Sequence, residues 1–257
     1  MNEVIGTYSD LAGKVAVITG GSRGIGARTA KEFARQGAKV CVVGRDRAAL
    51  ESVVAQISAE TGEAISVVAD VTDALAIEVV RTQVEAAFGT VDIVAAFAGG
   101  QGMPTPVLSL SEERWRQVVD SELTSAFLTV RAFLPGMVER GRGSVLLMSS
   151  AAGRQPSQAN LAYGVANAGV IMLTRQLAAE VGPAGVRVNC LAPSSIRTEK
   201  VAAHMPAAVQ EQVAAAHPLR RLGTTGDVAA AALFLASDAA GFLTGLTLDV
   251  AGGRITN

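Results

Sequence analysis

Residues Lys14 to Gly26 read KVAVITGGSRGIG, and this stretch decides which fold the chain can adopt. Lys14 to Thr19 is a short apolar run rich in β-branched residues, which is typical of a buried strand. A glycine-rich turn, Gly20 to Gly26, follows directly, and Ala27 to Gln36 then has the pattern of a helix. Strand, glycine turn and helix in this order form the context in which spaced glycines bind a dinucleotide.

The glycines of this turn have physical tasks that predict a pyrophosphate site. Gly20 and Gly24 would adopt backbone angles closed to other residues, and Gly26 would let the helix approach the strand closely. The free N–H groups at the helix start would face an anion. A tight turn without a ligand is the alternative, but the flanking strand and helix favour a cofactor site. The residues expected to form it are Gly20, Ser22, Arg23, Gly24, Ile25 and Gly26.

Length and composition agree with one large α/β domain. The chain has 257 residues, of which 49% are hydrophobic and 27 are glycines. This length lies within the range of one domain, so a single domain over residues 1–257 is expected. The net charge of -1 and the pI near 6.2 give no electrostatic reason to expect binding to nucleic acid or to an acidic membrane surface.

The cysteine pattern and the opening of the chain favour a reducing cytoplasm. Cys41 and Cys190 lie in apparent buried strands, and no CxxC or His-Cys cluster accompanies them. They are interpreted as packed thiols rather than as a disulfide or a metal pair. The opening MNEVIGTYSD lacks the apolar core of a signal peptide, and no uninterrupted apolar stretch reaches the roughly 20 residues that a membrane span needs.

Further apolar runs alternate along the chain with helical patterns. Each is short and almost continuously apolar, as in strands of a parallel sheet that helices cover on both faces. The intervening segments, of about 20 or more residues, suit right-handed crossovers. These features predict a doubly wound parallel sheet in three α/β/α layers. The expected strands are Val40 to Val43, Ile65 to Ala69, Ile93 to Ala96, Ser144 to Met148, Val186 to Leu191 and Thr247 to Val250.

Two segments depart from this regularity and are expected to be loops. Gly99 to Pro106 and Ser194 to Pro218 would each follow a strand at its carboxyl end. Ligands bind at this edge of open α/β sheets, so both segments are candidates for lining a site.

Several spaced motifs together resemble the short-chain dehydrogenase/reductase family, over nearly the whole chain. The resemblance implies a single Rossmann-type domain, an oxidoreductase activity on a small molecule, and a substrate lid at about residues 194–218. The matching motifs are TGGSRGIG at Thr19 to Gly26 for the cofactor loop, Asp70-Val71 for the adenine-contacting pair, Ser150 followed at the family's interval by Tyr163, and Pro193 with Thr198 for the nicotinamide-amide loop. Beyond the glycine loop, the implied cofactor-binding residues are Arg45, Asp70, Val71, Ala98, Gly99, Tyr163, Asn167, Pro193, Ile196 and Thr198.

Charge at the end of the second strand indicates which dinucleotide binds. NAD-preferring sites place an acid there for the ribose 2′-hydroxyl, whereas a 2′-phosphate needs cations. Here the strand ends in Gly44-Arg45, and Arg23 lies in the glycine loop. Two arginines at the expected phosphate position favour NADP(H) over NAD(H), as in the resembling family, although Asp46 is adjacent and a solvated Arg45 is the alternative interpretation.

The proton-transfer residues depart from the family pattern. In the family, a serine orients the substrate carbonyl, a tyrosine transfers the proton, a lysine four residues later lowers the tyrosine pKa, and an asparagine completes a water relay. Ser150 and Tyr163 match, but Asn167 occupies the lysine position and Glu122 the asparagine position. Tyr163 and Asn167 would still share one helix face, one turn apart. The family's NNAG strand end also departs, reading AFAG at residues 96–99.

Loss of the lysine predicts weaker base chemistry. A cation about 4 to 5 Å from a phenol, at an effective dielectric near 20, is worth roughly 3 to 4 kcal/mol, or about 2 to 3 pKa units. The pKa of Tyr163 is therefore expected closer to its unperturbed value, so that alcohol oxidation suffers more than carbonyl reduction. Asn167 can donate to a ribose hydroxyl, so cofactor binding should weaken without vanishing.

Three functions are compatible with these residues. The first is NADP(H)-dependent reduction of a carbonyl or polarised double bond of a small, largely apolar substrate, with Tyr163 as proton donor and Ser150 polarising the oxygen. The second is non-redox chemistry, namely isomerisation, elimination or ring closure, by Glu122 with a raised pKa together with Tyr163. The third is a catalytically silent cofactor-binding subunit in which Glu122 and Asn167 hydrogen-bond each other. Lys200, in the lid, could turn inward to replace the missing cation.

The remaining candidates have simpler interpretations. His204 and His217 are interpreted as surface or lid residues rather than metal ligands, because no third ligand is near in sequence. Trp115 is interpreted as a packing residue. Apolar walls of a substrate pocket are expected from Phe97, Met103, Leu161 and Met205. The family's tetramers imply a homo-oligomer, dimer or tetramer, or a hetero-oligomer with a catalytically complete chain. Its interface, unless they pack internally, would use Phe234, Leu235, Phe242 and Leu246.

Overall fold

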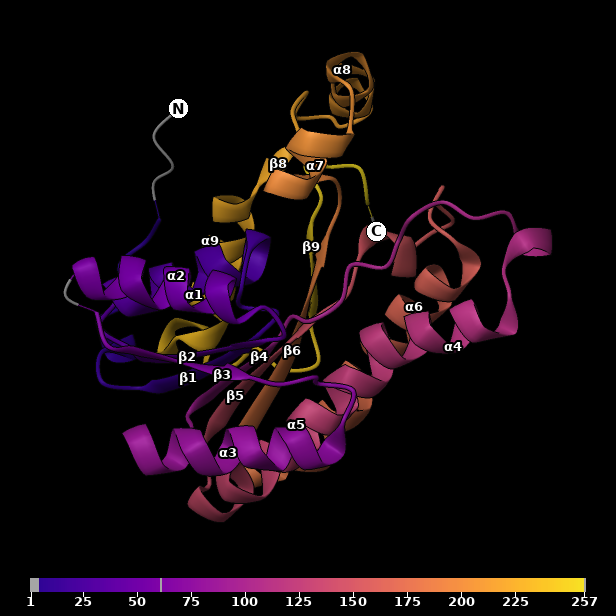
Figure 1. Ribbon diagram of the computed structural model, residues 1–257. Coiled ribbons are helices and arrows are strands. Elements are labelled where there is room, and N and C mark those ends of the chain that lie inside the picture. The colour runs from indigo at the N-terminus through magenta and orange to yellow at the C-terminus, as the bar shows by residue number, and fades with distance from the viewer. Residues whose placement is uncertain (1–4, 61, 257) are drawn as a thin grey trace.

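A seven-stranded parallel sheet forms the centre of the computed structural model, which describes residues 5–60 and 62–256. The strand order is β3-β2-β1-β4-β5-β6-β9, so the predicted doubly wound sheet is confirmed (Figure 1). The first four residues of the opening segment lie outside the described residues. The strands are β1 (Val15–Thr19), β2 (Lys39–Gly44), β3 (Ala64–Val68), β4 (Ile93–Ala96), β5 (Gly143–Met148), β6 (Val186–Pro193) and β9 (Thr247–Val250).

Helices cover both faces of the sheet and complete the three expected layers (Figure 1). One cluster of buried side chains joins the sheet to α1, α2 and α9, and a second joins the opposite face to α3, α5 and α6. Every residue of β1 is buried, because this central strand has helices on both sides. These helices are α1 (Gly24–Arg35), α2 (Arg47–Ala59), α3 (Ala74–Phe88), α5 (Ser125–Arg140), α6 (Leu161–Val181) and α9 (Thr225–Ala236).

The predicted strand ends differ from the observed ends by one or two residues. Two predicted runs coincide with β4 and β9. Ala69 lies just beyond the end of β3, and β6 continues past Leu191 to Pro193. Hydrogen bonding between strands decides these ends, and hydropathy does not report it.

The direction of winding reverses between β1 and β4, which are neighbours in the sheet. Thr19 and Ala96 are paired at the carboxyl ends of these strands. The hydroxyl oxygen of Thr19 accepts hydrogen bonds from the N–H groups of Phe97 and Ala98, at 3.1 and 3.2 Å. These contacts hold the two strand ends together at the point where an open α/β sheet has its binding crevice.

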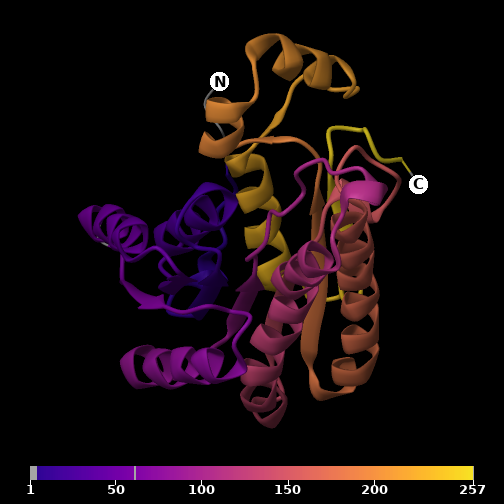
Figure 2. The same cartoon turned by 45° about the vertical axis from the view of Figure 1, so that its right-hand side comes forward.

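Residues 194–218 are largely folded into regular elements, so the prediction of a loop is wrong there. The segment contains β7 (Ile196–Arg197), α7 (Glu199–His204) and α8 (Ala207–Ala215). β7 pairs with β8 (Gly223–Thr224) in a separate two-stranded sheet. Because α7 is short and α8 is rich in alanine, neither shows a clear apolar period in the sequence. Both helices stand above the carboxyl ends of the central strands (Figures 1 and 2).

A continuous helical run leads into α5 and contains a π-helical turn. It begins with α4 (Glu112–Val119), passes through the π-helical residues Asp120–Thr124, and continues as α5. Glu122 lies within the π-helical turn. Such turns are rare, alter the direction of the side chains that they present, and are frequent at functional sites.

The apolar residues near the C-terminus are divided between core and surface. Leu235 is fully buried in α9, so it packs internally and cannot belong to an interface. Phe234 and Leu246 are partly buried against the same cluster, whereas Phe242 is fully exposed. Over residues 5–60 and 62–256, no helix has the length and apolar character to cross a membrane.

Candidate active site

The glycine turn between β1 and α1 has the close contacts that its sequence predicts. Gly20 and Gly24 have positive φ angles of 67° and 58°. A β-carbon on Gly26 would lie 2.2 Å from the carbonyl oxygen of Gly20, and one on Gly20 would lie 2.8 Å from that of Phe97. No side chain caps the first N–H groups of α1, whose N-cap residue is Arg23. The turn is therefore a side-chain-free cradle with free N–H donors, which fits a dinucleotide pyrophosphate.

A cavity of about 390 Å³ continues from this cradle over the ends of β2, β3 and β4. Many predicted cofactor residues line it, namely Gly20, Ser22, Arg45, Asp70, Val71, Ala98 and Gly99. Residues that the sequence analysis did not name also line it, including Thr72, Gln101, Arg114, Gln117 and Ser121. Arg114 and Gln117 lie in α4, Ser121 lies in the π-helical turn, and Thr72 and Gln101 lie in loops, and no motif marks these positions.

Both arginines proposed to bind a 2′-phosphate are exposed, and each pairs with a nearby carboxylate. Arg23 contacts Asp46 at 2.5 Å, while Arg45 lies 3.7 Å from Asp70. Asp46 also accepts the N–H of Ala49 at 3.1 Å as the N-cap of α2. Hydrogen bonds from the N–H and hydroxyl of Thr72 lower the pKa of Asp70, which the charge of Arg45 lowers further. Thus Asp46, the acid that follows Arg45 in the sequence, already pairs with Arg23 and caps α2.

The predicted nicotinamide-side residues lie on β6 and just beyond it. Pro193 ends β6, Ile196 is buried in β7, and Thr198 caps α7 by accepting the N–H of Val201 at 3.2 Å. A β-carbon on Gly24 would lie 3.5 Å from Cγ2 of Thr198. The glycine turn and the start of residues 194–218 therefore meet across the site. Ile25, which was predicted as part of the glycine turn, is partly buried against the core cluster that contains the buried residues of α1.

Asn160 anchors the start of α6, and the sequence analysis did not identify it. Its side-chain oxygen accepts the N–H of Tyr163 at 2.9 Å. Its amide nitrogen donates to the carbonyl oxygens of Gln101 and Met103, at 2.8 and 3.0 Å. The cap thus joins the loop after β4 to the helix of Tyr163. An asparagine directly before a helical run is an N-cap signal, but its loop partners are distant in sequence.

Tyr163 lies beside Ser150, as the motif spacing predicts. The Ser150 hydroxyl hydrogen-bonds the phenol, and a β-carbon on Gly102 would lie 3.2 Å from the ring. Burial raises the pKa of Tyr163 to about 12, the charge of Glu122 adds to the rise, and the bond with Ser150 opposes it. The expectation of a nearly unperturbed pKa is therefore wrong, because burial was not readable from the sequence.

Asn167 fills the lysine position with an amide that bonds the backbone of its own helix. The residue is buried, and its amide nitrogen donates to the carbonyl oxygen of Tyr163 at 2.9 Å. Its own backbone carbonyl oxygen accepts the hydroxyl of Ser149 at 2.9 Å. The side chain also faces Glu122 and helps to lower the pKa of that carboxyl group, so the hydrogen bond expected between the two residues stays a prediction. This amide stabilises the helix face that bears Tyr163.

Glu122 places a carboxylate in the interior of the site. The residue is 6% exposed and accepts the N–H of Gln101 at 2.8 Å. A β-carbon on Gly99 would lie 2.5 Å from Oε2 of Glu122 and would displace the carboxylate, and the φ of 149° at Gly99 also favours glycine. Burial raises the pKa of Glu122, whereas the backbone N–H groups, Asn167 and the charge of Lys200 lower it. Glu122 and Tyr163 thus form an electrostatically coupled pair.

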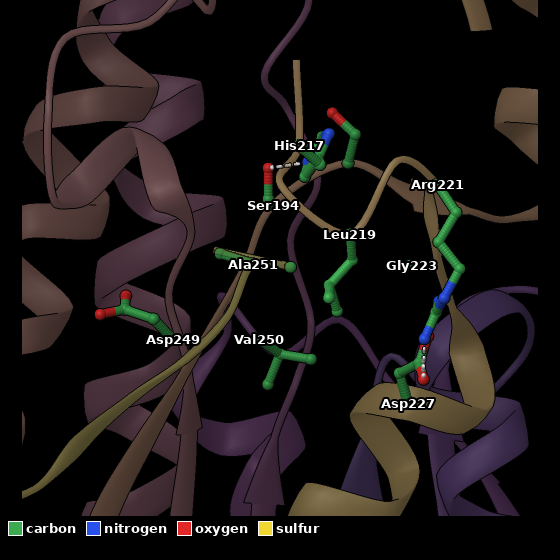
Figure 3. A pocket seen from close by; sticks show the side chains of 11 residues that line it. Ser194, His217, Leu219, Arg221, Gly223, Asp227, Asp249, Val250 and Ala251 are labelled. Carbon is green, nitrogen blue, oxygen red and sulfur yellow. Dashed lines mark hydrogen bonds and ion pairs between the residues drawn. The ribbon is translucent and has the colours of Figure 1, made fainter. Parts of the chain in front are cut away.

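Among the residues whose side chains the structure describes, no group of three or more His, Cys, Asp or Glu residues could hold a metal ion. His217 follows α8 within residues 194–218 and is buried, so of its two interpretations, a surface or a lid residue, the surface position is wrong. Its Nδ1 lies 2.7 Å from the Val213 carbonyl oxygen, and its Nε2 lies 2.9 Å from the Ser194 hydroxyl, beside a cavity of about 280 Å³ (Figure 3). The side chain of His204 lies outside the described residues.

The residues expected as pocket walls differ in exposure. Met103 and Leu161 are 63% and 49% exposed, on the loop and helix that flank Tyr163. Met205 is partly buried after α7, whereas Phe97 is buried in the core cluster. Trp115 is partly buried in α4. Met103 and Leu161 are therefore the members of this set that could meet a substrate.

Known proteins resemble the chain over nearly its whole length. A sequence model of the family described as Enoyl-(Acyl carrier protein) reductase matches residues 20–254. The dehydrogenase LinX of Sphingobium indicum, named for 2,5-dichloro-2,5-cyclohexadiene-1,4-diol, is 37% identical over 95% of this chain and 96% of its own. The 3-oxoacyl-(acyl-carrier-protein) reductase FabG of Chlamydia muridarum is 36% identical over 95% and 98%. The structure of levodione reductase matches with a TM-score of 0.90 and 31% identity, over 95% and 98%.

Proposed function

The chain belongs to the short-chain dehydrogenase/reductase family of oxidoreductases, and we propose that it is an NADP(H)-dependent reductase. Its substrate would be a small, largely apolar molecule with a carbonyl group or a polarised double bond. The observation that supports this direction of reaction best is the raised pKa of Tyr163, about 12. A phenol with this pKa is neutral near pH 7, so it can donate a proton but is a poor base for alcohol oxidation.

The cofactor would lie in the cradle and cavity at the β1–β4 junction. When bound, it supplies the hydride that reduction requires. The glycine turn would hold the pyrophosphate through backbone N–H groups, and Asp70 with Val71 would border the adenine. Pro193 and Thr198 would border the nicotinamide, because they lie across the site from the glycine turn.

The preference for NADP(H) rests on Arg23 and Arg45. Both guanidinium groups are exposed, and Arg45 lines the cofactor cavity. Arg23 lies in the adjacent glycine turn, where it pairs with Asp46, the N-cap residue of α2. A charge-assisted hydrogen bond is worth about 1.5 to 3 kcal/mol, so Arg45→Ala should weaken NADPH binding by roughly 10- to 100-fold. Binding of NADH should hardly change, and Arg47→Ala on the exposed face of α2 is the matched control. Equal losses for the two cofactors in fluorescence titrations would contradict the preference.

Tyr163, Ser150 and Asn167 would have different tasks in the proton transfer. Tyr163 would donate its proton to the developing alkoxide, and Ser150, already bonded to the phenol, would hold the substrate oxygen beside it. Asn167 would hold the helix backbone at Tyr163. Met103 and Leu161 would contact apolar parts of the substrate, beneath residues 194–218, which we interpret as the substrate lid.

Turnover of a substrate panel tests the proposal. NADPH oxidation should be followed with ketones, quinones and enoyl thioesters, and NADPH binding should be measured in the same samples. Tyr163→Phe should lower turnover by about 10² to 10⁴-fold while NADPH affinity falls far less, because the backbone of the glycine turn and Arg45 still hold the cofactor. The matched control is Tyr8→Phe, since the chain has 2 tyrosines. An undiminished rate in Tyr163→Phe would show that another group donates the proton.

Burial of Glu122 beside Tyr163 favours one alternative function. A carboxyl group whose pKa burial raises keeps its proton to a higher pH than an exposed one, which suits isomerisation, elimination or ring closure with the nucleotide as a structural element. Tight NADPH binding without oxidation, together with product formation that Glu122→Gln abolishes, would favour this alternative. Binding without any product would favour a catalytically silent subunit.

Surface and cysteine features bear on the oligomeric state and the cellular compartment of the protein. An apolar groove of about 500 Å³ lies between α5 and α6, where Phe127 is 44% and Val138 is 40% exposed. We propose that this face and Phe242 join copies in a homo-oligomer, which light scattering would measure. A partner chain with a complete lysine site would instead appear as mixed assemblies. The buried free thiols of Cys41 and Cys190 suit a reducing cytoplasm.

A further inference from the structure

A cation from residues 194–218 lies close to the loop that holds the buried carboxylate. Nζ of Lys200, in α7, is 3.5 Å from the carbonyl oxygen of Gly100. The carboxylate of Glu122 accepts the N–H groups of Gly100 and Gln101 in the same loop. The loop therefore contacts both charged groups: the Lys200 ammonium lies at a carbonyl oxygen of the loop, and the Glu122 carboxylate lies at its N–H groups. The positive charge of Lys200 lowers the pKa of Glu122.

The surroundings of Glu122 leave it in need of a positive charge. The side chain is 6% exposed, and the polar groups beside it, the loop N–H groups and the Asn167 amide, are neutral. A buried carboxylate without a counter-charge is costly. Tyr163 is the titratable group that faces it from α6. From α4, Arg114 directs its guanidinium to the side-chain oxygen of Gln101, at 2.8 Å.

We propose that Lys200 is the counter-ion of Glu122, so that the cation of this active site is carried by the lid and not by the helix of Tyr163. Lys200 is a positioning residue, because it acts on the phenol through Glu122. Asn167 and Glu122 replace a lysine and an asparagine of the family pattern, and Lys200 supplies the charge that this exchange removes. The cation is then in place only when α7 lies over the loop after β4.

This arrangement has a consequence for proton transfer. The charge of Glu122 disfavours the tyrosinate form of Tyr163, and a nearby ammonium group offsets part of that charge. Closure of the lid would therefore adjust both acid groups at the moment when the substrate is covered. The role in turnover rests on the proposed function, whereas the pairing of Lys200 with Glu122 does not.

Infrared titration of the whole protein tests the pairing without any substrate. The band of the protonated Glu122 carboxyl is identified by its loss in Glu122→Gln, and its midpoint is followed with pH. Lys200→Met should raise the midpoint by about half to one pH unit, because Lys200 is exposed and its field is partly screened. Lys200→Arg should restore it, and Lys31→Met on α1 should leave it unchanged. An unmoved midpoint in Lys200→Met would overturn the proposal.

A double-mutant cycle on the pH–rate profile tests the consequence for turnover. Lys200→Met should move the acid limb of the profile by the same half to one pH unit, about a 3- to 10-fold change at fixed pH on that limb. In the Glu122→Gln background this limb should be absent, and Lys200→Met should move nothing further. An equal rate loss from Lys200→Met in both backgrounds would contradict action through Glu122. If no substrate is found, the infrared result still decides the pairing, so failure of the proposed function is distinguishable from failure of this one.

Discussion

The glycine turn and the surroundings of Tyr163 are the two ends of the candidate site, and they differ in the groups that form them. At the glycine turn, the site consists of backbone N–H groups and of space that side chains would fill, as at Gly20 and Gly26. At Tyr163, the site consists of side-chain charges, buried and close enough to shift one another's pKa. The first end is defined by shape and the second by electrostatics. A chain can therefore retain the nucleotide cradle while it changes its acid/base groups.

The difference also determines what a substitution does at each end. A new side chain in the cradle displaces atoms, and its effect is steric and large. A new charge near Tyr163 leaves the backbone in place and changes proton affinities instead. Three substitutions separate these two kinds of effect, in order of decreasing size.

Gly26→Val should have the largest effect because its β-carbon would meet the carbonyl oxygen of Gly20 at 2.2 Å. We expect the overpacking to cost about 1 to 3 kcal/mol of folding free energy and the displaced turn to lose about 100-fold in NADPH affinity. Gly89→Ala is the matched control, since Gly89 has a φ of 83° and no atom within 4 Å of a new β-carbon. It should lower stability without weakening NADPH binding. Thermal melts and fluorescence titrations measure both quantities, and equal loss of affinity in the two variants would break the comparison.

Asn167→Lys should have an intermediate effect that is confined to proton transfer. A lysine cation about 4 to 5 Å from the phenol of Tyr163 lowers its pKa by about 2 to 3 units, from the present value of about 12. The phenolate fraction at neutral pH should rise about 100- to 1000-fold and alcohol oxidation by a smaller factor, because the phenolate is then less basic, while carbonyl reduction changes less. The pH–rate profile of oxidation measures this change. Asn167→Met, which has no charge, should give no gain, and a gain in that variant would point to a packing effect.

Glu122→Gln should have the smallest effect, on the pH dependence of stability. Burial raises the folded-state pKa of Glu122 above its ordinary value of 4.5, so its contribution to stability is present below about that pH and is lost as pH rises through the folded pKa. A difference of one between the folded and unfolded pKa corresponds to about 1.4 kcal/mol. Urea unfolding at pH 5 and pH 8 should therefore show a smaller decline for Glu122→Gln than for the parent chain. Glu113→Gln, an exposed position in α4, should leave the decline unchanged.

Most of the fold was predictable because its signals are local. Short apolar runs locate all seven strands of the main sheet within one or two residues, since a buried parallel strand is apolar along its whole length. The helices of residues 194–218 were missed, because short alanine-rich helices at the surface have no marked apolar period. The cradle was predictable for a related reason. Glycine spacing reports backbone angles directly, and Gly20 and Gly24 have the positive φ angles that it implies.

The amino-acid sequence by itself determined the doubly wound sheet, the nucleotide cradle and the identities of the altered residues Asn167 and Glu122. Only the tertiary structure decided how those residues behave. Asn160 reaches Gln101, and Lys200 reaches Gly100, across 59 and 100 positions of the chain. The pKa of Tyr163 depends on burial by such distant segments, and burial is a property of the packed molecule. Local backbone preferences depend on neighbouring residues in the sequence, whereas the electrostatic field at a buried group depends on every segment that packs around it.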